Sequence, residues 1–349
     1  MSGLYGMAAD HVMALEVVTA DGNFVTATNT SHPDLFWALR GGGGGTYGVV
    51  TSVVVRVHPQ IHATTSEYTI TTSSSETYFA ALKFFFGRFV EWTDAGTYSY
   101  FMAGKQGDSY SLTLMPFFAP NHTLAEFEEL MKPWYDKLDE LDIPVEYTTK
   151  FHETYHSAWA ETWGKDVMTN TVGRSNSLPG NRLFPRSSFE SPEKFETTFA
   201  AIQAHIEGGH FTIGYHQAPK NHANVDNGVS SAFRNVVAFL ITSVAVAEDA
   251  TAEELGEASR VLNEEVLAPW REVAPASEGG GSYLNEASVM EPEWQTEFYG
   301  VQYERLLGIK RDVDPRGVFY ATTGVGSEDW EVRDGNFGLQ TQDGKLCRL

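Results

Sequence analysis

The sequence predicts an α+β protein in which helices cover one face of an antiparallel sheet. Two observations predict this class. From about residue 61 to residue 270, strand-like segments with alternating apolar residues alternate with segments that have the apolar spacing of amphipathic helices. The chain has 349 residues, of which 42% are hydrophobic. It can therefore bury a large core, in two structural units or in one large unit with an appendage.

The segment before this region, up to Gln60, is predicted to form strands around one short helix. Residues 12–19 are apolar and β-branched, Asp21 and Gly22 form a hairpin-type turn, and residues 24–27 resume the strand. A helix then covers residues 35–40, and a valine-rich strand covers residues 49–57.

Two further sets of strands and helices follow, and they predict the larger sheet. The first set has strands at 68–72, 97–103, 110–117 and 145–149, a helix at 76–92 capped by Ser75, and a helix at 124–141 kinked at Pro133. The second set has a helix from Pro192 to Gly208, strands at 211–216 and 236–246, and a helix at 250–268 capped by Asp249. A glycine linker at 279–281 precedes a long helix at 292–310 and a tail rich in Gly and Asp.

The charge of the chain limits its partners. With 24 basic and 46 acidic residues the formal charge is -22, which disfavours nucleic acid and anionic membrane surfaces and favours a small neutral or cationic ligand. The single cysteine, Cys347, excludes an intrachain disulfide and a multi-thiolate metal site.

Nothing in the sequence assigns a compartment. Residues 1–10 lack the pattern of a signal peptide, and the longest apolar run, at 236–247, is too short to cross a membrane and is predicted to be a buried strand. Two glycosylation sequons, at Asn29 and Asn121, would suit a secreted parent.

A run of five glycines, Gly41 to Gly45, is the first motif that could bind a ligand. Gly43, Gly45 and Gly48 match the dinucleotide pattern G-x-G-x-x-G, but the predicted helix precedes the glycines and the predicted strand follows them. This order is the reverse of a Rossmann motif, which is therefore excluded. The run still allows the backbone to approach a ligand closely, and a flexible loop is the alternative.

The sequence His152-Glu153-Thr154-Tyr155-His156 matches the zinc-binding pattern H-E-x-x-H. On a helix the two histidines would share one face and bind zinc, while the glutamate would activate water. Aromatic residues at 151, 155, 159 and 163 also explain such a helix by packing alone, and the extended pattern with a third histidine is absent. No metal site is assigned.

The segment Tyr283-Leu284-Asn285 is the third candidate. If it is extended, the phenol and the side-chain amide point to the same side and face one ligand together. A phenol with a lowered pKa accepts a proton from a substrate hydroxyl or amine. The alternative is that Tyr283 only packs.

Several of these stretches, taken together, resemble a known family. Residues 5–12 (YGMAADHV), 17–22 (VVTADG) and 34–51 (DLFWALRGGGGGTYGVVT) resemble the second half of the FAD-binding domain of the vanillyl-alcohol-oxidase superfamily. Residues 283–287 (YLNEA), 298–300, 303–306, 309–310 and 314–319 resemble the berberine-like C-terminal segment of fungal FAD-linked oxidases. Residues 181–186 resemble the substrate domain of that group more loosely.

The resemblance implies a division of the chain. Residues 1–60 would be the C-terminal half of a truncated PCMH-type FAD-binding domain, and residues 61–282 an antiparallel-sheet substrate domain with helices on one face. Residues 283–330 would return to the FAD domain, followed by a tail at 331–349. The family's N-terminal lobe, with its flavin-linked histidine and pyrophosphate loop, is expected to be missing from this chain.

The resemblance also implies the roles of single residues. Gly48, Val49 and Val50 would contact the adenine end of FAD, and Tyr5 and Gly6 would lie near the flavin-binding loop. Asn285 would lie beside the isoalloxazine, with Tyr283 as the catalytic base. This geometry requires the glycine run and the Tyr-Leu-Asn segment to wall one cavity. Two positions depart from the family: Gln302 replaces a frequent asparagine, and Ser288 a frequent aspartate.

The function expected from this resemblance is an FAD-dependent oxidoreductase. It would remove a hydride from a small alcohol, amine or sugar-like substrate, with dioxygen reoxidising the flavin, and the truncated chain could be inactive. The alternatives are a zinc hydrolase that uses His152, Glu153 and His156, and a non-catalytic remnant.

Overall fold

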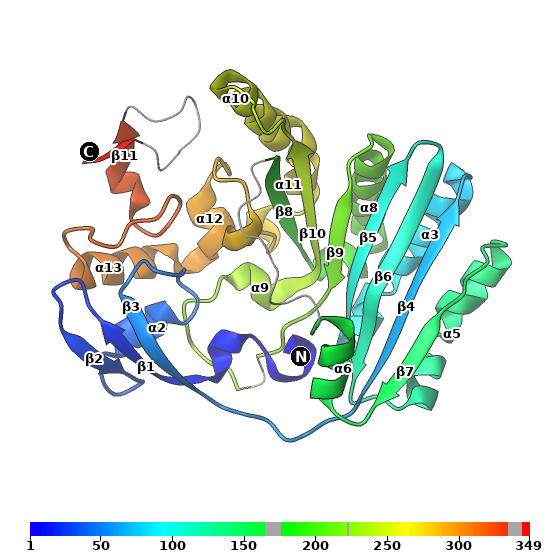
Figure 1. Cartoon of the computed structure of the whole chain (residues 1–349), viewed down its shortest axis with the longest axis horizontal. Helices are drawn as coiled ribbons and strands as arrows, with labels where there is room; N and C mark the ends of the chain where they lie inside the picture. Colours follow the sequence, from blue (N-terminus) through cyan, green and yellow to red (C-terminus); the bar gives the residue numbers. More distant parts are fainter. Residues whose placement is uncertain (165–175, 222, 334–343) are drawn as a thin grey trace.

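The computed structural model describes residues 1–164, 176–221, 223–333 and 344–349 (Figure 1). The described part holds a three-stranded, a seven-stranded and a two-stranded sheet, and every strand pair in them is antiparallel. The predicted α+β class is therefore confirmed. No helix among these residues is long and apolar enough to span a membrane.

The three-stranded sheet is built near the N-terminus, in the order β2-β1-β3. It contains β1 (Val12–Val18), β2 (Phe24–Ala27) and β3 (Val49–Val55), and α2 (Pro33–Leu39) lies between β2 and the glycine run. These elements agree with the sequence prediction. Because α2 precedes the glycines and β3 follows them, the exclusion of a Rossmann motif is also confirmed.

Strand β3 is an edge strand with an unusual composition. Val49, Val50, Val53, Val54, Val55 and the following Val57 are between 44% and 84% exposed. A nearly continuous valine run is typical of a strand that is covered on both faces. An exposed, apolar edge strand is a place where another chain segment readily pairs.

The seven-stranded sheet has the order β7-β4-β6-β5-β9-β10-β8. Its strands are β4 (Ala63–Thr72), β5 (Tyr98–Gln106), β6 (Ser109–Pro120), β7 (Thr148–His152), β8 (Ser177–Pro185), β9 (Thr212–His216) and β10 (Val236–Ala245). The sequence prediction missed β8, because Pro179 and Gly180 are residues that usually mark a turn. It also placed the start and end of β7 too early in the chain.

Helices cover one face of this sheet (Figure 1). They include α3 (Ser75–Gly87), α4 (Phe89–Asp94), α5 (Leu124–Glu140), α7 (Ser187–Glu190), α8 (Pro192–Glu207) and α11 (Ala268–Val273). Large aromatic side chains fill the layer between sheet and helices, among them Phe85, Phe89, Trp92, Trp134 and Trp270, all fully buried. The predicted helical layer on one face is present, but α6 (Tyr155–Thr162) lies against the opposite face, where Tyr155 packs on Phe118.

Two predicted helices are interrupted near the sheet. The helix expected at 76–92 divides at Arg88 into α3 and α4, and its cap is Ser74, whose Oγ accepts a hydrogen bond from the Thr77 amide, not Ser75. The helix expected at 250–268 begins after Thr251, not Asp249, because Thr251 and Glu254 form a capping box. After α10 (Ala252–Arg260) it continues as a π-helical turn, Val261–Val266.

The third interruption divides the helix expected at 292–310. It consists of α12 (Trp294–Tyr299), a 3₁₀ turn (Gly300–Gln302) and α13 (Tyr303–Val313). Gly300 has φ +59°, and a Cβ there would lie 2.5 Å from Ser231 Oγ. The glycine therefore lets the chain turn where α9 (Ser231–Asn235) approaches.

The opposite face of the large sheet carries a row of aromatic residues. Tyr100 on β5 pairs with Tyr215 on β9, which pairs with Phe239 on β10. Their rings lie 5.2 Å and 5.5 Å apart, and Tyr98 adds a fourth ring 5.7 Å from Tyr215. Side chains that alternate along a strand point to opposite faces, so this row faces away from the helical layer.

The C-terminal part of the chain returns to the three-stranded sheet and α2. Leu306, Tyr299 and Phe298 share one core with α2 residues such as Phe36 and Trp37. The two-stranded sheet, β11 (Trp330–Arg333) and β12 (Lys345–Arg348), follows this return. Segments from the two ends of the sequence thus form a single packed unit.

Lys310 fixes this return with three hydrogen bonds, two of them buried and one partly buried. Its Nζ donates to the Thr46 carbonyl at 2.7 Å, to Asp314 Oδ2 at 2.7 Å and to the Phe319 carbonyl at 2.6 Å. Both members of the Lys310–Asp314 pair are buried. Asp314 also accepts hydrogen bonds from the amides of Val318 and Phe319.

Replacing Lys310 is expected to destabilise the whole protein. Lys310→Met would leave the Asp314 carboxylate buried without its counter-charge, so the free energy of unfolding should fall by about 3–5 kcal/mol. Urea denaturation measures this loss. The control is Arg311→Ala, since Arg311 is 61% exposed and should change stability by less than about 0.5 kcal/mol. Equal stability of both variants would contradict the expectation.

A second prediction concerns His216, which is fully buried between Thr97 and Ser99. Burial lowers the pKa of His216 from 6.5 to about 3. Between these values the unfolded chain binds a proton that the folded chain excludes, so stability falls as the pH falls from 6.5 towards 3. In His216→Gln the slope of the unfolding free energy against pH should decrease by up to about 1.4 kcal/mol per pH unit. Unfolding curves measured at several pH values test this, with the exposed His156→Gln as control.

Candidate functional site

The glycine run forms a tight loop whose conformation requires glycine. Gly41, Gly43 and Gly45 have φ values of +119°, +97° and +72°, which L side chains rarely adopt. A Cβ on Gly41 would lie 2.4 Å from the Val229 amide nitrogen, whereas nothing lies within 4 Å of a Cβ on Gly44. One side of the loop is therefore packed against the protein, and the backbone at Gly44 borders open space.

The Tyr283 segment is held by a single amide side chain on the large sheet. Asn181 on β8 donates to the Tyr283 carbonyl at 3.0 Å and accepts from the Tyr283 amide at 2.8 Å. The Tyr283 ring packs edge-on against Phe233 and Phe239, at 5.3 Å and 5.9 Å. Tyr283 is thus fixed both in its backbone and in its ring.

The segment after Tyr283 is not extended, as the sequence analysis had assumed. Residues Leu284–Glu286 form a 3₁₀ turn, with Tyr283 at its N-cap position. The two polar side chains nevertheless meet, because Asn285 Nδ2 donates to Tyr283 Oη at 2.8 Å. The tight turn, and not the alternation of a strand, brings them together.

The glycine loop and the Tyr283 segment wall one cavity of about 250 Å³, the glycine-loop cavity. Its lining residues are Met7, Ala9, Leu39, Gly41, Gly43, Gly44, Val229, Ser230, Phe233, Tyr283, Leu284, Asn285, Phe298 and Tyr299. Segments from opposite ends of the sequence therefore share a cleft. Its volume is below the roughly 300–1,000 Å³ of most small-molecule sites, so it accommodates only part of a large ligand.

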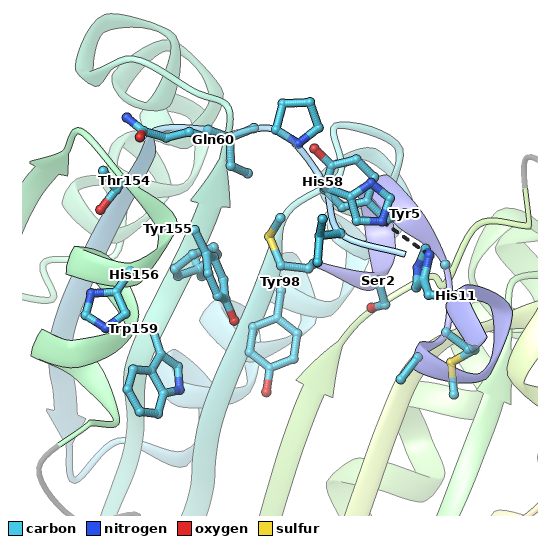
Figure 2. Close-up of a pocket in the computed structure, with 18 of the residues that line it drawn as sticks. Ser2, Tyr5, His11, His58, Gln60, Tyr98, Thr154, Tyr155, His156 and Trp159 are labelled. Atoms are coloured by element: carbon cyan, nitrogen blue, oxygen red, sulfur yellow. Dashed lines mark hydrogen bonds between the residues drawn. The ribbon is translucent and has the colours of Figure 1, made fainter. Parts of the chain in front are cut away.

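A second, larger cavity of about 1160 Å³ adjoins the first at Met7, which lines both. We call it the aromatic cavity (Figure 2). It lies between the N-terminal segment, the connection from β3 to β4, strands β5 and β6, and helix α6 (Tyr155–Thr162). Its lining residues are Met1, Ser2, Tyr5, Gly6, Met7, Ala8, His11, Val57, His58, Pro59, Gln60, Ile61, Tyr98, Phe118, Thr154, Tyr155, His156, Trp159, Trp163 and Gln217.

Asp10 anchors the N-terminal segment that separates the two cavities. Its carboxylate accepts two hydrogen bonds from Arg234 at 2.7 Å and one from Asn227 at 2.8 Å. Burial acts to raise the pKa of Asp10, but the hydrogen bonds from Arg234 and Asn227 outweigh it and hold the pKa below its usual value. Residues 5–10 are therefore positioned by a charged contact with the segment before β10.

The predicted site residues fall into three groups. Tyr283 and Asn285 line the glycine-loop cavity, and Tyr5 and Gly6 line the aromatic cavity. The third group, Gly48 with Val49 and Val50, lines neither cavity. Gly48 lies against β1, where a Cβ would be 2.6 Å from Val17 Cγ1, and Val49 and Val50 are exposed on β3.

Two features of the site were not found from the sequence alone. Asn181 lies on the strand that the prediction missed, so its contact with Tyr283 had no local signal. Glu286, which lines neither cavity, follows Asn285 in the chain, and burial raises the pKa of its carboxyl. Burial raises the pKa values of Tyr98 and Tyr215, and the nearby Glu286 carboxylate raises them further. The acidic residue in the Y-L-N-E motif was the available signal.

The H-E-x-x-H motif does not form the predicted helix. His152 ends strand β7, Glu153 lies in the turn, and only His156 lies on α6, which begins at Tyr155. His152 is buried and its Nε2 is hydrogen-bonded to Thr65 Oγ1 at 3.0 Å. Among the described residues, no group of three or more His, Cys, Asp or Glu side chains is arranged to hold a metal.

Comparison with known proteins shows which proteins the chain is similar to. A model described as "Berberine and berberine like" matches residues 282–326. The whole chain is 34% identical to the FAD-linked oxidoreductase patO of Aspergillus clavatus and 31% identical to the bifunctional decalin synthase calF of Penicillium decumbens. It spans 58% and 59% of the length of these two proteins.

The fold agrees with this relationship. The VAO-type flavoprotein MtVAO615 from Myceliophthora thermophila superposes on the whole chain with a TM-score of 0.85, at 28% identity, and the chain covers 61% of it. A xylooligosaccharide oxidase from the same fungus, at 19% identity and a TM-score of 0.63, shares the fold. Over its whole length the chain is therefore similar to VAO-type flavoproteins, and its residues 282–326 match the berberine-like segment.

The arrangement of the H-E-x-x-H residues leads to a direct prediction. After dialysis against metal-free buffer, the purified protein should contain much less than one zinc per chain, because His152 and His156 do not face one ion. Elemental analysis by mass spectrometry measures the content. Stoichiometric zinc that disappears in His156→Ala would contradict this expectation and restore the hydrolase alternative.

Proposed function

We propose that the chain is the substrate-binding and catalytic portion of an FAD-dependent oxidoreductase. The observation that carries this proposal is the glycine-loop cavity, where the backbone of Gly43 and Gly44 faces Tyr283 and Asn285. The similarity to FAD-linked oxidoreductases over the full chain supports the choice of cofactor. When bound, FAD supplies an acceptor for a hydride from the substrate carbon.

The residues around the cavity fit a flat, polar ring system. Gly44 offers a backbone that no side chain shields, and Asn285 offers an amide on the opposite wall. The cavity is small, and the adjacent β3 is an exposed apolar edge strand. We therefore propose that this chain supplies one side of the FAD site, and that a further polypeptide segment covering β3 supplies the other side.

Tyr283 is the proposed catalytic base. Its oxygen accepts a hydrogen bond from Asn285, which stabilises negative charge on that oxygen. Asn181 holds the Tyr283 backbone, and Phe233 and Phe239 hold its ring, so the phenol is fixed in direction. In this arrangement Tyr283 takes the proton of a substrate hydroxyl or amine while the neighbouring C–H bond loses its hydride.

The aromatic cavity is the proposed substrate site, because it adjoins the glycine-loop cavity at Met7. Tyr5 and Gly6, on the wall of the aromatic cavity, remain proposed neighbours of the flavin-binding loop. Gly48, Val49 and Val50 remain proposed contacts of the adenine end of FAD. Dioxygen is the proposed final electron acceptor, with hydrogen peroxide as the product.

The experiment combines FAD binding with turnover. The chain is titrated with FAD, followed by flavin fluorescence, in parallel with a chimaera that carries the additional residues of patO. Bound flavin should appear at least in the chimaera, with hydrogen peroxide released from an alcohol or amine panel. If neither protein binds FAD, the proposal is wrong.

Removal of the Tyr283 hydroxyl tests the catalytic role. Tyr283→Phe in the flavin-loaded chimaera should lower kcat by about 10² or more, since general-base catalysis contributes that much, while FAD affinity stays nearly the same. Stopped-flow flavin reduction measures the step directly. Tyr147→Phe is the matched control, because Tyr147 is an exposed tyrosine that lines neither cavity. Equal reduction rates in both variants would exclude Tyr283 as the base.

A further inference from the structure

The aromatic cavity has a lining that contrasts with the rest of the molecule. The whole chain is rich in charge, with 24 basic and 46 acidic side chains. None of the described residues that line the cavity is Asp, Glu, Lys or Arg. The cavity therefore lacks a charged side chain to pair with an ionic ligand.

Aromatic rings form two walls of the cavity. Figure 2 shows Tyr155, His156 and Trp159 on one side and Tyr5, His58 and His11 on the other, with Tyr98 between them. Tyr5 stacks on His58 with ring centres 3.8 Å apart and planes 11° apart. His58 is also hydrogen-bonded to His11 at 3.2 Å, so this wall is a fixed, flat surface.

The wall formed by Tyr155, His156 and Trp159 continues from α6 onto the sheet as a set of rings in contact with one another. Phe118 lies 5.7 Å from Trp163 and 5.8 Å from Tyr155, and Trp163 lies 6.2 Å from Tyr98. Rings at these separations pack edge-on or offset, which leaves their faces and edges available to a third ring. Two aromatic walls that face each other favour a ligand that is itself flat.

Three of the polar atoms on these walls are hydrogen-bond donors without partners in the described part of the protein. No hydrogen bond is formed by Tyr98 Oη, Tyr155 Oη or Trp159 Nε1 with other described residues. Burial raises the pKa of Tyr98, so its phenol stays protonated at neutral pH and donates. The cavity thus offers a few donors within an apolar surface, which suits a ligand with one or two oxygen acceptors.

We propose that the aromatic cavity binds a neutral, flat, aromatic or polycyclic molecule that carries a hydroxyl or carbonyl oxygen. This inference rests on the proposed function in assigning that molecule as the substrate. A charged ligand would lose its hydration without gaining an Asp, Glu, Lys or Arg side chain as a counter-charge. An oligosaccharide would need many more hydrogen-bonding partners than these walls present.

The test uses binding to the chain without flavin, measured by isothermal titration calorimetry. The probes are 2-naphthol, 2-naphthoate, 2-naphthylmethylammonium and xylobiose. The first three share one ring system and are neutral, anionic and cationic, and xylobiose represents a sugar. We expect 2-naphthol to bind at least tenfold more tightly than each of the others. Tighter binding of the ammonium probe or of xylobiose would overturn the proposal.

Three variants decide whether binding occurs in this cavity. Trp159→Ala, which removes one ring from the wall that includes α6, should weaken 2-naphthol binding tenfold or more. Tyr98→Phe should weaken 2-naphthol about three- to tenfold but leave naphthalene unchanged, because only the hydrogen bond is lost. Phe211→Ala is the control, since Phe211 is 49% exposed and lines neither cavity. If Trp159→Ala and Tyr98→Phe both bind 2-naphthol as tightly as Phe211→Ala and the unchanged chain do, the proposal is wrong.

Failure of this inference differs from failure of the proposed function. A flavin-loaded chimaera that oxidises a sugar while the chain ignores 2-naphthol leaves the oxidoreductase proposal intact. A chain that binds 2-naphthol in this cavity, together with a chimaera that never binds FAD, leaves the cavity assignment intact and removes the redox function.

Discussion

The structure depends on the attachment of the C-terminal segment to the glycine loop near the N-terminus, and Lys310 is the centre of that attachment. A buried ammonium group is stable only when oxygen atoms surround it. These oxygens come from Thr46 at the end of the glycine loop, from Asp314 one turn later in the chain, and from the Phe319 carbonyl. The position of the glycine loop is therefore coupled to the position of α13.

A second buried cation connects the same C-terminal segment to the large sheet. Arg182 on β8 is 1% exposed, donates to Glu297 on α12 at 2.5 Å, and donates through two nitrogens to the Ala274 carbonyl. Asn181, its neighbour, holds Tyr283. Asn181 and Arg182, which are consecutive on β8, together with Lys310 thus hold the segments that line the glycine-loop cavity. The shape of this cavity follows from polar contacts between distant segments and not from the loop sequence alone.

Local patterns in the sequence predicted the elements whose signals are local. The β1–β2 hairpin, the start of the α8 helix at Pro192, and the valine strand all follow from side chains within a few residues. The H-E-x-x-H motif and β8 were not predictable in this way. His152 is in a strand because β7 pairs with β4, and Ser177–Pro185 is a strand because β10 lies beside it. Pairing over such sequence distances overrides local propensity.

The charge of the candidate site was likewise not predictable from local or average properties of the sequence. The formal charge of -22 predicted a neutral or cationic ligand, yet net charge is a property of the whole surface. The larger cavity is assembled from the N-terminus, the connection to β4, and strands β5 and β6, and none of its described lining side chains is charged. Only the fold brings these segments together. Ligand choice is therefore decided by the few residues that meet at the cavity, and the average composition constrains only the approach of a ligand through solvent.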